Sequence, residues 1–431
     1  MSIASVNSRI LDPVYDRASG RAEYRFAPNT LFQSDLRLIN IGVISDTTAD
    51  APNPILGILG AIKSITLMDG STQLDALNFA NLWMSFRNAH KSNNDNSSLQ
   101  RFLKFVQTGY TTQGNFLMAD GLIGTAQPKI IVQQPQVYNA KQLDTDRSWI
   151  SLKDMLPFLR SSLYLPTNIF KQLRLVIEYN SPAELTNLTL KSVGTKTTSS
   201  DSLLLCEEVG DSDFKTQVMK QYKGVVFRPI EHEQVFVPAI GGLTEGGVRT
   251  SIAPNNYLLS GFNNKKLVRV CVIQQGTDAV VADGNVIGYG DMASVAPYKS
   301  AIQFRVNGSN VLAGAGMSGS ATGSYANRQL AYLNDAWGVS NIFMGQNVSN
   351  LPTTENIGHP ERVGQQDYIG LTIDAKIAEL QLNYSRVGVA NISAGDTKNQ
   401  KLVQALNLHV FGEVEKAVVM NQSGSYNVVY V

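Results

Sequence analysis

SITLMDGSTQLD, residues 64–75, and SAIQFRVNGSNV, residues 300–311, share one layout. In each, apolar and polar residues alternate and then reach an acid or amide followed by Gly-Ser: Asp69-Gly70-Ser71 and Asn307-Gly308-Ser309. Alternation predicts a β-strand, and Asp-Gly or Asn-Gly after a strand predicts a tight turn. The triplets lie 307 − 69 = 238 residues apart. We interpret the second stretch as a diverged copy of the first.

Other residues recur in the same order at similar distances. Five pairs are 205 positions apart (380 − 175 = 205): Leu175 and Leu380, Ile177 and Leu382, Tyr179 and Tyr384, Glu208 and Glu413, and Val209 and Val414. Phe26-x-Pro28 also matches Phe236-x-Pro238, at 236 − 26 = 210 positions. The shared order predicts an internal duplication whose loops differ in length.

Strand patterns dominate the whole chain, and no regular helices separate them, so a doubly wound α/β sheet is not expected. The chain has 431 residues, enough for two units of about 200 residues each. Units of that size with long, glycine-rich loops fit jelly rolls better than immunoglobulin sandwiches. The sequence therefore predicts an all-β protein of two tandem eight-stranded antiparallel jelly rolls with a few short helices in loops. We expect an N-terminal arm over residues 1–22, a first jelly roll over 23–215 and a second over 216–431.

Four segments have helical patterns. Residues 73–90 place five large apolar residues on roughly one face, and Ser151 resembles an N-cap with Asp154 three residues later. A third segment opens on Thr167, and a fourth ends at Gly338, the residue that helix C-termini prefer.

Composition limits the function. Lys and Arg exceed Asp and Glu by 36 − 35 = 1, so the protein is not expected to work by neutralising nucleic-acid phosphates. Cys206 and Cys271 lie in apolar strand-like runs, which predicts buried free thiols. The N-terminal stretch lacks the apolar segment of a signal peptide, and no apolar run approaches the ~18 residues of a membrane helix. We expect synthesis in a reducing cytoplasm.

The segment RSWISLKDMLPFLRSSLYLPTNIFKQLRLVIEYN, residues 147–180, resembles the stretch that closes the first jelly roll in double jelly-roll major capsid proteins, particularly those of polinton-like viruses and virophages. The shared features are a short helix with Leu156-Pro157, then Leu165-Pro166-Thr167, then a strand ending Ile177-Glu178-Tyr179-Asn180. With the duplication placed around this segment, the resemblance extends over nearly the whole chain beyond the arm.

The resemblance implies a non-enzymatic homotrimer whose six jelly rolls form a pseudo-hexagonal capsomer of an icosahedral virion. Strands would stand upright to the shell, loops would form outer towers, and terminal arms would lie beneath. Implied partners are neighbouring capsomers and minor capsid or penton proteins, with an internal membrane left open. No sequence-specific nucleic acid is expected, and synthesis would take place in the host cytoplasm.

Chemical motifs are few. GAGMSG, with Gly314, Gly316 and Gly319, matches a dinucleotide-binding spacing but lacks the surrounding βαβ unit, so a surface loop is expected. Ser318 nearly fits a nucleophile elbow, but Ser320 replaces its last glycine.

The four histidines are also scattered: His90, His232, His359 and His409. We expect His409 to be a structural residue within its strand. In Glu231-His232-Glu233, alternation would place the carboxylates on one face and the imidazole on the other, which disfavours one shared metal and suggests a solvated strand edge. Asp283-Gly284 reads as a tight turn. We predict no catalytic, cofactor-binding or metal-binding residues and no cofactor.

Two other classes of protein remain open. A β-sandwich carbohydrate-binding protein or glycoside hydrolase would need paired carboxylates and aromatic platforms, for which Trp83, Trp149 and Trp337 are the only tryptophans. A shell protein of mixed α/β type would need a long helix, and no helical pattern here is long enough.

Overall fold

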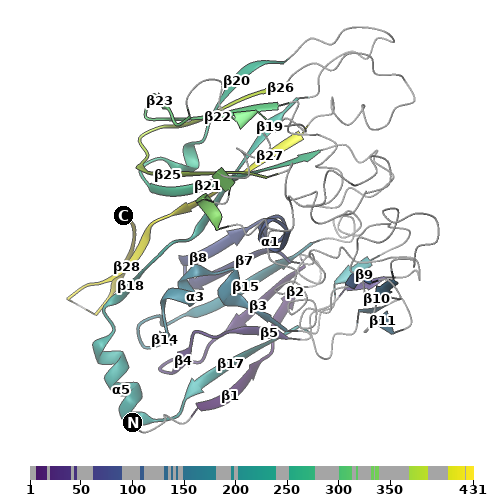
Figure 1. Cartoon of the computed structure of the whole chain (residues 1–431). Coiled ribbons are helices and arrows are strands. Elements are labelled where there is room, and N and C mark those ends of the chain that lie inside the picture. Colours follow the sequence, from purple (N-terminus) through teal and green to yellow (C-terminus); the bar gives the residue numbers. More distant parts are fainter. Residues whose placement is uncertain are drawn as a thin grey trace.

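The computed structural model consists mainly of antiparallel strands in two stacked units (Figure 1). It describes residues 6–16, 20–39, 43–45, 62–89, 107–110, 131–133, 137–138, 142–143, 149–180, 196–198, 202–238, 252–276, 300–312, 317–318, 332–333, 335–338, 368–386, 406–422 and 424–431. Within these ranges no helix is long and apolar enough to cross a membrane.

The first unit packs two sheets face to face. One runs β1 (Val6–Leu11), β17 (Leu203–Val209), then β4 (Leu31–Gln33) and β5 (Arg37–Ile39) end to end, flanked by β14 (Tyr164–Pro166) and β13 (Trp149–Ser151). The other runs β2 (Val14–Asp16), β3 (Arg21–Arg25), β15 (Leu173–Tyr179), β7 (Ile62–Asp69) and β8 (Thr72–Asn78). Tyr24 of β3 and Tyr179 of β15 both reach Ser202 across the core, at 2.9 and 2.7 Å from its hydroxyl.

Short strands form two further sheets beside this unit. One has the order β11 (Val137–Tyr138), β12 (Gln142–Leu143), β6 (Val43–Ser45) and β16 (Lys196–Thr198), and the other pairs β10 (Ile131–Gln133) with β9 (Gln107–Tyr110).

The second unit repeats the arrangement. Its first sheet has the order β19 (Ile230–Val237), β27 (Leu406–Val414), β21 (Lys266–Gly276) and β25 (Tyr368–Lys376). Its second has the order β20 (Ile252–Leu258), β26 (Leu380–Arg386), β22 (Ser300–Val306) and β23 (Ser309–Asn310), with β24 (Met317–Ser318) also on β22. A one-turn helix, η3 (Ser260–Phe262), joins β20 to β21.

Chain order and sheet position match strand for strand between the units. β1, β3, β4 with β5, β7, β8, β13 with β14, β15 and β17 correspond in turn to β19, β20, β21, β22, β23, β25, β26 and β27. This is the jelly-roll strand order written twice, which confirms the predicted fold class, with two of the first unit's eight strand positions each split into two short strands.

The predicted residue pairs agree with the structure only in part. Leu175, Ile177 and Tyr179 on β15 and their partners on β26 all face a core, so this register is confirmed. Glu208 lies on the same face of β17 as Cys206, which is the core face. Glu413 lies on the other face of β27 from Val410, which points into the core of the second unit. The pairing of Glu208 with Glu413, and with it that of Val209 with Val414, is therefore wrong, because a shift of one residue exchanges the two faces of a strand.

The pairing of Phe26 with Phe236 is also wrong. Phe26 follows β3, whose equivalent is β20, whereas Phe236 lies within β19, the equivalent of β1.

The turns at Asp69-Gly70-Ser71 and Asn307-Gly308-Ser309 make the same unusual contact. Asp69 Oδ1 accepts a hydrogen bond from the backbone N–H of Gln172 (2.6 Å), just before β15. Asn307 Oδ1 accepts from the backbone N–H groups of Ala378 and Glu379 (2.7 and 3.1 Å), just before β26. In both units the turn side chain therefore fixes the start of the neighbouring strand, so the Asp69–Asn307 equivalence is real.

Replacing Asn307 by alanine should lower the free energy of unfolding by about 2 kcal/mol. Alanine loses these bonds and the 2.9 Å bond from Asn307 Nδ2 to the Lys376 carbonyl, and it is strained at φ 49°. Asn307→Gly should cost only about 1 kcal/mol, because glycine adopts this backbone conformation freely. Denaturant unfolding of both variants measures the difference; losses below about 0.5 kcal/mol in both would contradict the role of the side chain.

The predicted helix over residues 73–90 is correct only in its second half. Residues 72–78 form β8, and α1 (Ala80–Ala89) begins after it. The register of β8 on β7 skips Leu74, because Leu67 pairs with Asp75 and Met68 with Gln73. This β-bulge buries Leu74 and Leu77 at a spacing of three, which imitates a helical pattern.

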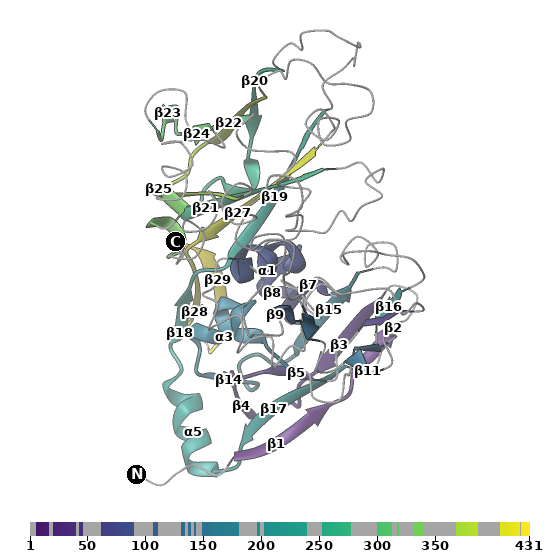
Figure 2. The same cartoon turned by 45° about the vertical axis from the view of Figure 1, so that its right-hand side comes forward.

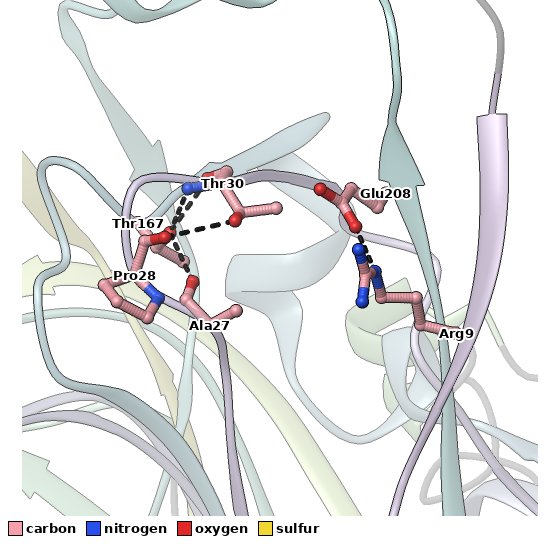
Figure 3. A network of polar contacts seen from close by, with 6 residues as sticks. All are labelled: Arg9, Ala27, Pro28, Thr30, Thr167 and Glu208. Carbon is pink, nitrogen blue, oxygen red and sulfur yellow. Dashed lines mark hydrogen bonds and ion pairs between the residues drawn. The ribbon is translucent and has the colours of Figure 1, made fainter.

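The other predicted helix ends differ as well. Ser151 makes no capping hydrogen bond to η2 (Leu152–Asp154), which leads into α3 (Pro157–Ser161). Residues after Thr167 form turns, not a helix. The Thr167 hydroxyl instead accepts from the backbone N–H of Thr30 (2.7 Å) and lies 2.7 Å from the Ala27 carbonyl oxygen, to which it donates (Figure 3). Gly338 does end a helical segment with φ 61°, as predicted.

The N-terminal segment is part of the first jelly roll. Residues 6–11, which the sequence assigned to an arm, form β1 and pair with β17 along their whole length. Arg9 on β1 forms an ion pair with Glu208 on β17 (Figure 3). The prediction of an arm is wrong for residues 6–11. Their mixture of charged and polar side chains resembles a solvated tail, but the pairing of their backbone with β17 does not depend on those side chains.

A helix and a small sheet link the two units (Figure 2). α5 (Ser212–Gln221) contains the predicted boundary at residues 215 and 216 and is capped by Asp211, which accepts from Asp213 N and Phe214 N. The chain then enters β18 (Gly224–Phe227), which pairs with β28 (Lys416–Met420), and β28 pairs with β29 (Tyr426–Tyr430). The start of the second unit and the end of the chain thus form one sheet against the first unit.

Candidate functional site

Most of the sequence motifs for chemistry do not meet in the structure. Gly314, Gly316, Gly319, Ser320, Asp283, His90 and His359 lie outside the described residues. Ser318 lies in β24, where it pairs with Ala301. Among the described residues no group of three or more His, Cys, Asp or Glu side chains could hold a metal ion.

His232 and His409, however, come together. They lie on the paired strands β19 and β27, and His232 Nε2 is 3.0 Å from His409 Nδ1, so one ring nitrogen donates to the other. Phe79 of the first unit packs over both rings, with centroids 4.5 and 4.9 Å away. Burial lowers the pKa of His232 to about 4. Burial and the neighbouring His232 lower the pKa of His409 to about 3, so both imidazoles are neutral at pH 7.

The carboxylates beside His232 point the other way, as alternation predicted. They are not simply solvated, however. Glu231 accepts from the Tyr430 hydroxyl (2.7 Å) and forms an ion pair with Lys265 (3.6 Å). Glu233 accepts from the backbone N–H of Gly261 (3.0 Å). β19 is an edge strand in the described sheet, but its two glutamate side chains make contacts within the chain.

The main feature at this place is a buried aromatic junction between the two jelly rolls. Trp83 and Phe86 of α1 meet Trp337 and Phe411 of the second unit. The ring of Trp83 lies 5.1 Å from that of Trp337 and 5.4 Å from that of Phe411. All four side chains are nearly completely buried. Offset and edge-on aromatic pairs of this kind add to the stabilisation from burial alone.

Trp337 is held in place from several sides. Its indole N–H donates to the Val270 carbonyl (2.9 Å), and the Arg269 guanidinium stacks 4.2 Å above its ring. Gly370 on β25 lies below it, where an added Cβ would be 2.8 Å from the ring and 2.4 Å from Leu333. A larger residue than glycine would therefore displace Trp337 from the junction.

Phe79 has an unusual backbone conformation, with φ 51°. It connects β8 to α1, and its carbonyl accepts the Trp83 N–H (3.1 Å). A large side chain in this region costs about 1–3 kcal/mol. Since Phe79 covers the histidine pair, its packing offsets this strain.

Buried charges lie near the junction. Asp75 on β8 is fully buried; its Oδ2 accepts from Phe158 N (2.8 Å), while Oδ1 has no partner. Burial raises the pKa of Asp75 to about 7, against the opposing effects of the Phe158 N–H and of Lys416 on β28. Lys416 is also buried, and its ammonium lies 5.3 Å from the centre of the Tyr430 ring.

The C-terminal strand fastens both units. The Tyr426 hydroxyl donates to Asp69 Oδ2 in the first unit (2.7 Å), and its ring packs 5.1 Å from that of Phe170. Tyr430 donates to Glu231 in the second unit. One short strand therefore holds the turn of one jelly roll and the edge of the other.

The sequence alone does not indicate this junction. The sequence predicts Trp83 and Trp337 in core helices. Their burial is confirmed, but the two rings contact each other instead of belonging to two separate cores. The same burial removes both as aromatic platforms for a sugar. Cys206 and Cys271 are buried free thiols, as predicted.

No protein-family model matches the sequence, and no curated protein is significantly similar to it. Solved structures do match over its whole length. A PBCV-1 protein fitted into a reconstruction of the virophage Sputnik matches with a TM-score of 0.58 and 12% identity, covering 100% of this chain and 98% of that one. The Faustovirus major capsid protein matches with a TM-score of 0.53 and 9% identity, covering 98% and 92%.

The mavirus major capsid protein matches with a TM-score of 0.51 and 8% identity, covering 98% of this chain and 90% of that one. At sequence identities this low, the similarity shows that the folds are alike and nothing more. Each alignment covers nearly the whole length of both chains. The two jelly rolls and the connection between them therefore align as one unit. The chain therefore has the double jelly-roll fold of these viral major capsid proteins.

Proposed function

We propose that the protein is a major capsid protein that assembles as pseudo-hexagonal homotrimers into an icosahedral viral shell and has no enzymatic activity. The observation that carries the proposal is the strand-for-strand equivalence of its two jelly rolls together with full-length similarity to capsid proteins. Three chains would present six nearly equivalent units, and six such units pack in a hexagonal array.

The rigid joint between the units supports this role. A capsomer needs its two jelly rolls fixed at one angle, because neighbouring units must meet at repeated positions. The aromatic junction and the C-terminal strand supply that rigidity within one chain. A formal net charge of +1 limits repulsion between crowded copies.

Under this proposal the protein resides in the virion after synthesis in the host cytoplasm. Its partners are further copies of itself and minor capsid or penton proteins at the vertices, and it reads no nucleic-acid sequence. Contact with an internal membrane is a further part of the proposal, tested by vesicle flotation of the assembled particles.

Purified full-length protein should sediment as a particle of three chains of 46.9 kDa each. Electron microscopy of concentrated samples should show six-lobed particles or hexagonal arrays, because heterologous contacts that do not close extend into lattices. A chain that stays monomeric at micromolar concentration would overturn the proposal. A reproducible glycan-dependent signal from such a monomer would favour the sugar-binding alternative.

A further inference from the structure

Arg87, in the last turn of α1, lies where the first jelly roll meets the second. It follows Trp83 by four positions, so both side chains lie on the same side of the helix. Trp83 packs on Phe411 of β27, and Phe411 is directly paired with Cys271 of β21. Burial raises the pKa of Cys271, and the nearby charge of Arg87 opposes that rise. Arg87 is therefore half-buried between α1 and the β21–β27 face of the second unit.

The charge of Arg87 is not compensated by a partner. Within the part of the chain that the structure describes, Arg87 has no hydrogen bond or ion pair. The acids near it are already engaged. Glu413 forms an ion pair with Arg269, and Asp154 forms one with Arg160. Three guanidinium groups and two carboxylates thus leave one positive charge over in a partly buried place, and such a charge is costly without a counter-ion.

Electrostatics agree with this count. Burial lowers the pKa of Arg87, and the charges of Arg269 and Arg160 lower it further. Asp154 and Glu413 act in the opposite direction, each with a smaller effect than either arginine. The surroundings of Arg87 are therefore positive on balance and suited to an anion.

We infer that Arg87, Arg269 and Arg160 bind a phosphate group at the junction between the two jelly rolls. A guanidinium presents its N–H groups in a planar fork that matches two oxygens of a phosphate. The three arginines come from α1, β21 and α3, so the bound anion would contact both units. This ligand site goes beyond the proposed function, because assembly into a shell does not by itself require a ligand.

The site is open to solvent on one side only. The side chains of Arg160 and Asp154 are 63% and 52% exposed, whereas Arg269 is 32% exposed and stacks on the buried Trp337. A phosphate ion can therefore enter from the α3 side without separating the two units. Bound there, it lies beside the guanidinium that covers the Trp337 indole, so tryptophan fluorescence reports its binding.

The test is a phosphate titration of the full-length protein, followed by tryptophan fluorescence and thermal unfolding, with sodium chloride of equal ionic strength as the reference. Phosphate should change the fluorescence saturably and raise the melting temperature, because a ligand of the folded state stabilises it. Arg87→Gln should weaken binding by about ten-fold or more, the loss expected from one charge-assisted bidentate pair. Arg87→Lys should weaken it less, because lysine keeps the charge but not the fork.

Arg228→Gln is the matched control. Arg228 is 52% exposed and pairs with Glu415, outside this site, so the variant should bind phosphate like the wild type. A parallel titration with adenosine monophosphate distinguishes the two sources of the group. Tighter binding of the ester would identify a phosphorylated small molecule, and tighter binding of inorganic phosphate would identify the free ion.

Stability in the two salts gives a second readout. In chloride, Arg87→Gln should be at least as stable as the wild type, because it removes an uncompensated charge. In phosphate the order should reverse. If Arg87→Gln does not fold, Arg160→Gln at the solvent edge replaces it and should weaken binding about three-fold or more.

Two results would overturn the inference. The first is a wild type that responds to phosphate no more than to chloride. The second is an Arg87→Gln or Arg160→Gln variant that binds phosphate as tightly as the wild type, which would mean an adventitious ion only.

Discussion

Replacing Trp83 by alanine should lower the free energy of unfolding by about 3–5 kcal/mol, the range for removing a fully buried large aromatic residue. Trp83 is 4% exposed and lies between Phe86 of its own helix and Trp337 and Phe411 of the other jelly roll. The cavity left behind cannot collapse easily, since rigid strands hold Phe411 on one side and the Val270 carbonyl holds Trp337 on the other. Chemical denaturation measures the loss.

A spectroscopic readout separates damage at the junction from damage elsewhere. Trp337 is buried at 5% exposure beside Trp83, so its fluorescence should shift to longer wavelength when Trp83 is removed and water reaches the ring. Phe304→Ala is the matched control: Phe304 is fully buried in the core of the second unit and should cost a similar energy without this shift. A loss below about 1 kcal/mol for Trp83→Ala would mean that the junction does not hold the two units together.

The sequence predicted the two like units because a jelly-roll core requires apolar residues at every second position. Leu175, Ile177 and Tyr179 could be matched to β26 on that basis alone. The same periodicity failed at Leu74, where a bulge changes the spacing of buried residues, and at Glu208, where a slip of one residue goes unnoticed if only identities are compared.

The junction could not be predicted because it depends on contacts between residues far apart in the chain. His232 and His409 are separated by 177 positions, and Phe79 reaches them only through a backbone conformation that large side chains rarely adopt. Alternation places each histidine on a face of its strand, but it does not say which other unit covers that face.

Lowering the pH from about 7.5 to 4.5 should remove about 5 kcal/mol of stability through the histidine pair. The pKa values are about 4 for His232 and about 3 for His409, compared with an ordinary 6.5 in the unfolded chain. The unfolded state therefore binds more protons than the folded state below pH 6.5, and stability falls as the pH drops toward the folded pKa values. Only the two pH units between 6.5 and 4.5 contribute, at about 1.4 kcal/mol for each unit, which gives ~2–3 kcal/mol for each ring.

Asp75 acts in the opposite direction over much of the same range. Its pKa is raised to about 7 from 3.8, so the folded state holds a proton that the unfolded state releases, and its contribution favours folding at the lower pH. The total stability curve of the wild type mixes the two effects. The decisive quantity is the difference between the wild type and a His232→Gln/His409→Gln variant, which keeps Asp75 and every other carboxylate.

The free energy of unfolding of the wild type minus that of the double glutamine variant should fall by about 5 kcal/mol between pH 7.5 and 4.5. Only the wild type loses this stability, because glutamine cannot be protonated in this range. Asp75→Asn is the complementary control and should steepen the acid loss by removing the opposing contribution. A difference between wild type and the double glutamine variant that stays constant with pH would mean that both imidazoles reach water in the folded protein. Because Phe79 covers the pair, that result would also place the first jelly roll away from β19 and β27. The pH dependence of stability thus reports, through His232 and His409, whether the first jelly roll packs against β19 and β27 of the second.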